Sequence, residues 1–104
     1  MPSVDLDEQK ALDVALGGLV LRELSEDDGV AHLTIEIGRS GLPCVTVTSG
    51  TRPLMLPSDE LLEAACRLAD AHERAGTGLT GAAYRFEKQP SGRWSMAGDF
   101  TYAG

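Results

Sequence analysis

The last third of the chain alternates between apolar and polar residues on both sides of a short turn, Lys88-Gln89-Pro90-Ser91-Gly92. All five aromatic residues of the protein lie at alternating positions of this stretch: Tyr84, Phe86, Trp94, Phe100 and Tyr102. A period of two on both sides of a Pro- and Gly-containing turn is typical of an antiparallel hairpin with one apolar face. Residues 76–102 are therefore predicted to form such a hairpin, which needs a helix or another sheet to cover its aromatic side.

Residues 57–75 have the periodicity of a helix. Ser58 is placed to cap its first turn, Asp59 and Glu60 favour its positive end, and Gly76 ends it. One half of the helical wheel is apolar except for His72 near its middle, and its apolar residues are Leu61, Leu62, Ala64, Ala65, Leu68, Ala69, Ala71 and Ala75. A face made of Ala and Leu can lie close against a sheet.

Two further strands are predicted between residues 30 and 48. Residues 30–37 alternate strictly, with Ala31, Leu33 and Ile35 on one face, and residues 44–48 are rich in β-branched side chains. Residues 51–56 read as an extended edge limited by Pro53 and Pro57.

The start of the chain allows two interpretations. Acidic residues precede an apolar segment, and Gly17-Gly18 follows it, so we expect the first helix to end near Leu16. Residues 19–24 are then a strand, which we favour because a helix continuing to Leu24 would place several carboxylates at its negative end.

These elements predict a single α+β domain covering residues 1–104. Its element order is α-β-β-β-(β)-α-β-β, and short links force the successive strands to pair antiparallel. We expect an antiparallel sheet of five to six strands with two helices packed on one face.

The net charge of −7 is unevenly distributed. Residues 1–28 carry eight acidic side chains against Lys10 and Arg22, which leaves only −1 for the rest. Such a field disfavours a nucleic acid and favours a basic protein partner. We expect the carboxylates that bind this partner to include Asp5, Glu8, Glu26, Asp27 and Asp28.

Composition also bears on location. No apolar run approaches the about 20 residues of a membrane-spanning helix, and residues 1–5 lack the basic start of a signal peptide. We therefore expect a cytoplasmic protein that does not insert into a membrane.

No motif of catalysis or cofactor binding stands out. We expect His72 to be a core histidine with satisfied ring nitrogens, His32 to be solvated, and Cys44 and Cys66 to be buried free thiols. A zinc site would need these four residues to converge from four elements. The dinucleotide-binding pattern G-x-G-x-x-G occurs at Gly76-Thr77-Gly78-Leu79-Thr80-Gly81. We do not expect it to bind a dinucleotide, because it leads from a helix into a strand instead of from a strand into a helix. We expect no enzyme, no metal and no cofactor.

The segment from Leu68 to Gly78, followed by the hairpin to Asp99-Phe100-Thr101-Tyr102, resembles the C-terminal part of the YezG-like family of bacterial immunity proteins. The resemblance covers about the last third of the chain and implies a helix, a Gly-Thr-Gly turn and two closing strands. It also implies an antidote that binds and blocks a toxin domain, without catalytic residues.

The expected function is thus that of a non-enzymatic, immunity-type inhibitor that binds a toxin polypeptide. One alternative is a small acidic chaperone-like module for a secreted protein, which would act as a homodimer. Another is a small-ligand-binding domain with a pocket near His72, Tyr84 and Trp94.

Overall fold

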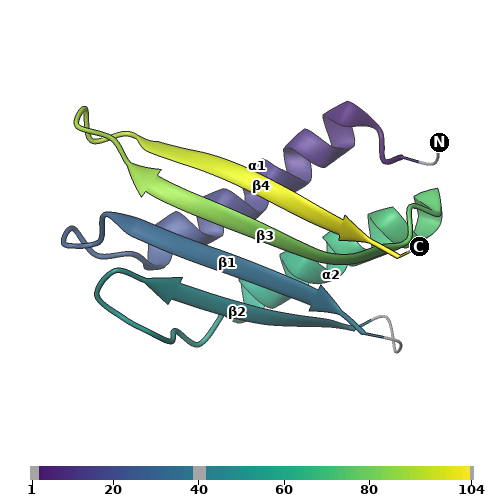
Figure 1. Cartoon of the computed structure of the whole chain (residues 1–104), viewed down its shortest axis with the longest axis horizontal. Helices are drawn as coiled ribbons and strands as arrows, with labels where there is room; N and C mark the ends of the chain where they lie inside the picture. Colours follow the sequence, from purple (N-terminus) through teal and green to yellow (C-terminus); the bar gives the residue numbers. More distant parts are fainter. Residues whose placement is uncertain (1–2, 39–41, 104) are drawn as a thin grey trace.

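The chain folds into a four-stranded antiparallel sheet with both helices on one face, as Figure 1 shows. The computed structural model describes residues 3–38 and 42–103. Its elements are α1 (Leu6–Glu23), β1 (Val30–Ile37), β2 (Pro43–Ser49), α2 (Asp59–Ala75), β3 (Leu79–Lys88) and β4 (Trp94–Tyr102). The strand order is β2-β1-β3-β4, and every neighbouring pair is antiparallel.

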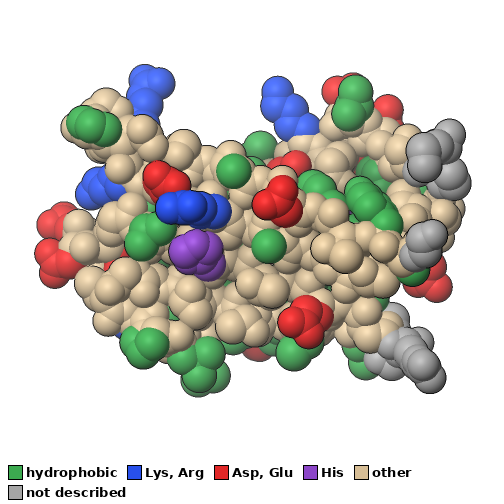
Figure 2. Space-filling view, in the orientation of Figure 1, with side chains coloured by type: hydrophobic (Ala, Val, Ile, Leu, Met, Phe, Trp, Pro, Cys, Tyr) green, Lys and Arg blue, Asp and Glu red, His purple; other side chains and the backbone are tan. Residues whose placement is uncertain are grey.

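The two faces of the sheet differ as the alternating pattern predicts. The helix side carries the fully buried core residues of the strands: Ala31, Leu33, Ile35, Val47, Tyr84 and Phe86. The other side is open, and Figure 2 shows a few charged side chains and one histidine on it. The register places Gly98 opposite Tyr84 and Phe100 opposite Ala82, so the aromatic residues of the hairpin share the helix side. The predicted one-sided hairpin is confirmed.

The number of strands is lower than the five to six predicted. Residues 19–23 belong to a helix, and residues 51–56 pair with the sheet through a single bridge between Val47 and Met55. Pro53 and Pro57 cannot donate to a ladder, and Leu54 on the same segment is 69% exposed. A segment without a continuous ladder, in which only Met55 is buried, does not extend the sheet.

The largest correction concerns α1, which continues through Gly17-Gly18 to Glu23. The prediction that a helix ends near Leu16 is wrong, because Gly17 serves close packing instead of chain reversal. A Cβ at Gly17 would lie 3.0 Å from the Met96 sulfur and 3.5 Å from the Phe86 ring. The missing side chain therefore lets α1 lie directly on the β3–β4 hairpin.

The second helix is confirmed as predicted. The Ser58 hydroxyl accepts a hydrogen bond from the Leu61 N–H at 3.1 Å, and Gly76 ends α2 in the left-handed conformation, with φ of 70°. Ion pairs join the end of each helix to the start of the other. Arg22 near the end of α1 meets Glu60 at the start of α2, at 3.0 Å. The helices therefore run antiparallel.

The two adjacent glycines of α1 give a matched test of this packing. Gly17→Leu should destabilise the protein by about 1–3 kcal/mol, because the new side chain overpacks the contact with the hairpin. Gly18→Ala should stabilise it by about 0.5–1 kcal/mol, because a Cβ there meets nothing within 4 Å and the helix gains rigidity. Urea unfolding followed by circular dichroism measures both. A Gly18→Ala variant that unfolds more easily would contradict a continuous helix.

Candidate functional site

A chain of hydrogen bonds crosses the layer between the helices and the sheet. The Tyr84 hydroxyl and the Gln9 amide both donate to Oδ1 of Asp13, at 2.7 and 2.8 Å. Gln9 Oε1 lies 2.7 Å from Nε2 of His72, whose Nδ1 lies 2.8 Å from the Thr77 hydroxyl. Four elements or their ends thus meet through side chains: α1, α2, the turn after α2, and β3.

The Asp13 carboxylate fixes the direction of every bond. A carboxylate only accepts, so Gln9 directs its NH2 toward Asp13 and its oxygen toward His72. Nε2 of His72 must therefore carry a proton, and Nδ1 accepts from the Thr77 hydroxyl when the ring is neutral. The imidazole has no ring nitrogen left for a substrate, and the prediction of a satisfied core histidine is confirmed.

Burial sets the protonation states of the chain. It lowers the pKa of His72, an effect that the nearby carboxylates of Asp13 and Glu8 only partly oppose, so the ring is neutral at pH 7. Burial and the contact with Asp13 raise the pKa of Tyr84. The phenol therefore stays protonated and keeps donating to Asp13.

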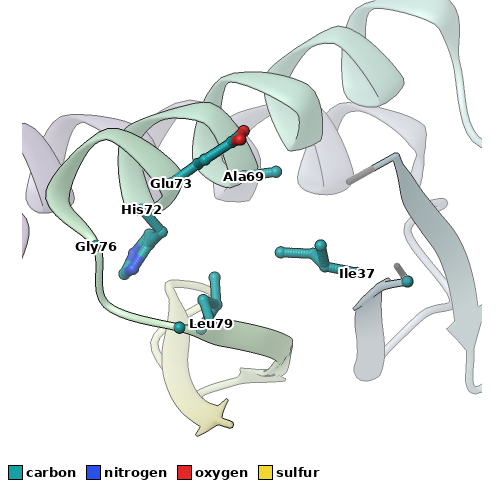
Figure 3. A pocket seen from close by; sticks show the side chains of 8 residues that line it. Ile37, Ala69, His72, Glu73, Gly76 and Leu79 are labelled. Atoms are coloured by element: carbon teal, nitrogen blue, oxygen red, sulfur yellow. The ribbon is translucent and has the colours of Figure 1, made fainter. Parts of the chain in front are cut away.

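A hollow of about 390 Å³ lies beside His72, at the end of the sheet where α2 stops (Figure 3). Ile37, Ala69 and Leu79 form its apolar wall, and His72 and Glu73 are its titratable residues. Tyr84 and Trp94 do not line it, although the small-ligand alternative placed a pocket near these two residues and His72. Tyr84 lies under α1 with its hydroxyl bonded to Asp13, which places it in the core.

The remaining candidate residues have structural explanations. Cys44 and Cys66 are both exposed, so the prediction of buried thiols is wrong. Cys44 lies on the open face of β2, where alternation directs it away from the helices. His32 is exposed as predicted. Gly78, with φ of 76°, lets the chain enter β3 directly after the cap of α2. Within the described residues, no group of three or more His, Cys, Asp or Glu side chains could hold a metal ion.

The acidic residues expected to bind a partner fall into two groups. Asp5 and Glu8 lie at the start of α1, and Glu26 and Asp27 follow its end; all four are exposed. The 18 residues of α1 span about 27 Å, so the two groups are well separated. Glu8 also lies 3.7 Å from Arg74 on α2.

Asp28 is different, because its side chain is buried and internally bonded. Its carboxylate accepts from the Ser25 N–H at 2.9 Å, the Thr51 N–H at 3.2 Å and the Thr51 hydroxyl, and Arg52 lies 3.8 Å away. The hydrogen bonds from Thr51 and Ser25 hold the pKa of this carboxyl well below its usual range. Asp28 therefore links two loops, and we leave it out of the partner-binding surface.

The helices bring further acidic residues next to those of the N-terminal segment. Residues 5–28 and 58–76, here called the helix layer, contain thirteen acidic and four basic side chains, a formal charge of −9. The rest of the sequence contains three acidic and five basic ones, or +2. Eleven acidic residues of the helix layer are exposed: Asp5, Asp7, Glu8, Glu23, Glu26, Asp27, Asp59, Glu60, Glu63, Asp70 and Glu73. The protein is thus electrostatically two-sided.

No protein-family model matches this chain, and no curated protein does so either. Of the helices in the described ranges 3–38 and 42–103, none is long and apolar enough to span a bilayer.

The buried carboxylate of Asp28 makes stability depend on pH. Asp28→Asn should lower the free energy of unfolding at pH 7, because an amide cannot accept all of these hydrogen bonds. The pKa of Asp28 is lower in the folded than in the unfolded state, so its contribution is present above about pH 4 and is lost as the pH falls further. Urea unfolding between pH 7 and pH 2.5 should show wild type and variant converging in acid. The exposed neighbour gives the control, since Asp27→Asn should change little.

The chain of hydrogen bonds from Tyr84 to Thr77 predicts a second change in the free energy of unfolding. Gln9→Leu should cost about 1–3 kcal/mol, because the N–H of His72 then has no acceptor in a buried position. Tyr84→Phe should cost less, about 0.5–1.5 kcal/mol, because Asp13 keeps its bond from Gln9. Urea unfolding at pH 7 shows which of the two variants loses more free energy of unfolding. The reverse order would contradict the assigned proton directions.

Proposed function

We propose that this chain is a non-enzymatic protein-binding domain of the immunity type, which binds and neutralises a basic toxin polypeptide in the cytoplasm. The observation that carries the proposal is the segregation of charge between a helix layer of −9 and a remainder of +2. A surface with one sign of charge accelerates the encounter with a partner of the opposite sign and disfavours partners of its own sign.

The partner surface that fits is rich in Lys and Arg and meets the outer side of the two helices. Four basic residues of the helix layer are exposed: Lys10, Arg22, Arg67 and Arg74. Three of them already have acidic neighbours, as in the contacts of Arg22 with Glu60 and of Arg67 with Glu63, at 3.0 and 3.2 Å. The carboxylates outnumber them, so a cationic partner meets a net excess of acceptors.

The buried titratable groups His72 and Tyr84 are engaged within the protein, which supports binding over catalysis. Both ring nitrogens of His72 are engaged, by Gln9 and by Thr77. The Tyr84 phenol is committed to Asp13. A general acid or base needs a proton-carrying atom that can reach a substrate. These groups instead hold α1, α2 and β3 together.

The resemblance of the last third of the chain to YezG-like immunity proteins points in the same direction. That likeness rests on the helix, the Gly-Thr-Gly turn and the closing hairpin, which occupy α2, β3 and β4. It suggests that the partner is a toxin domain made by the same cell.

Co-expression with the polypeptide encoded beside this protein tests the proposal. The neighbour alone should arrest growth, and the wild-type protein should restore it. Glu26→Lys combined with Asp27→Lys should lose most of the protection and weaken binding at least tenfold, because the encounter surface loses four units of negative charge.

A matched variant separates the helix layer from general acidity. Glu36→Lys with Asp99→Lys changes the net charge by the same amount, but both residues are exposed strand residues outside the helix layer. This variant should protect like the wild type. Equal loss with both variants would refute a role for the helix layer, and absence of binding to any neighbouring polypeptide would refute the immunity function.

A further inference from the structure

Strand β4 leaves one edge of the sheet unpaired. It ends the strand order, and within the described residues no strand lies on its outer side. The Gln89 N–H donates to the Arg93 carbonyl, and the Ala103 N–H donates to the Gly78 carbonyl, both at 2.7 Å. Backbone groups alternate along a strand, so the odd-numbered residues of β4 face β3. The even-numbered residues, from Trp94 to Tyr102, direct their N–H and C=O groups outward.

This edge lacks the usual protection against pairing. Natural edge strands are short or carry Pro, Lys or inward charges. β4 is nine residues long, contains neither Pro nor Lys, and has Asp99 as its single charge. The side chains of its even-numbered residues lie on the helix side, where Met96 is 40% and Tyr102 48% exposed.

The first helix extends past the same edge. Figure 1 shows the N-terminal half of α1 projecting beyond β4 instead of lying under the sheet. Glu8 and Arg22 face α2, through Arg74 and Glu60. A line of residues on the far side of α1 repeats every four positions: Leu6, Lys10 and Val14. Leu6 is 85% and Val14 63% exposed, so large apolar side chains stand uncovered beside the open edge.

We propose that this edge binds a second copy of the chain through antiparallel pairing of β4 with β4, with the twofold axis at Gly98. An isologous contact must be self-complementary, and residues at equal distances from Gly98 on the two sides of β4 are similar enough to pair with each other. Trp94 then lies opposite the partner's Tyr102, and Met96 opposite the partner's Phe100. On the open face Asp99 lies opposite the partner's Ala97, so no like charges meet.

The pairing also covers the projecting half of α1. The axis places the Trp94 end of one strand beside the Tyr102 end of the other, which lies close to the start of α1. Met96, exposed on its own copy, and Trp94 then lie over the partner's Leu6, Lys10 and Val14. Each copy thus covers the projecting half of the partner's α1, and its own projecting half is covered by the partner.

Size and charge both favour a second copy as the occupant. Nine residues extend about 30 Å, and a contact that spans the strand and the helix, at about 10 Å for each layer, buries about 600 Å² from each copy. A standard interface buries about 800 Å² from each partner, whereas crystal contacts stay below about 400 Å². The contact also avoids the exposed carboxylates of α2, which would otherwise repel a second acidic chain.

The first test measures the molar mass by light scattering over a range of concentrations. The wild type should be a dimer, and Leu6→Glu with Val14→Glu should weaken dimerisation at least tenfold. Leu54→Glu with Leu56→Glu is the matched control, since both residues are exposed on the loop before α2. The control should remain dimeric. Circular dichroism shows whether each variant is folded.

The second test fixes the register by cross-linking. In a Cys44→Ser, Cys66→Ser background, chains with Ala97→Cys are mixed with chains carrying Asp99→Cys and are oxidised mildly. These positions form a non-hydrogen-bonded pair, with Cα atoms about 4.5 Å apart, within the range of a disulfide. The mixed pair should cross-link in high yield, and Ala97→Cys alone should not.

Three outcomes would overturn the proposal: a monomer at every concentration, a dimer equally insensitive to both glutamate variants, or cross-linking of Ala97→Cys alone. The dimer does not rest on the proposed function. Protection against a neighbouring toxin and self-association can each fail while the other holds.

Discussion

The width of the sheet must match the width of the helices that cover it, and the fold follows from this constraint. Four strands at about 4.8 Å span about 19 Å, and two helices at about 10 Å each span about 20 Å. A fifth or sixth strand would expose core side chains that the helices could not reach. Because α1 crosses the sheet obliquely, the match fails at β4, where part of the helix extends beyond the edge and Met96 stays half exposed.

The elements with redundant local signals were predictable from the sequence. α2 has a capping serine, acidic residues at its start, an apolar face and a terminal glycine, and all of them agree. β1 was predicted with its observed bounds, because strict alternation carries the whole signal. α1 was predicted in part, because Gly17 has two conflicting meanings. A glycine can end a helix, or it can let another element pack closely against the helix. Only the position of Met96 in the folded protein shows that Gly17 has the second role.

The polar contacts were less predictable, since they depend on residues far apart in the chain. The helical wheel placed His72 among apolar residues, which correctly indicated a core position. Its acceptor Gln9 lies 63 residues away and gave no signal beyond its spacing of four from Asp13. Asp28 resembled its acidic neighbours in sequence. Its burial depends on Thr51, which comes into reach only once the loop after β2 has folded.

The carboxylate of Asp28 has a consequence for how the protein opens. It holds the backbone N–H of Ser25, just after α1, and that of Thr51, in the loop before α2, so neither loop can open without disturbing the other. Fraying of α1 is thereby confined to its N-terminal end. In hydrogen exchange, the amide protons of these two residues would share one opening event and be lost in step.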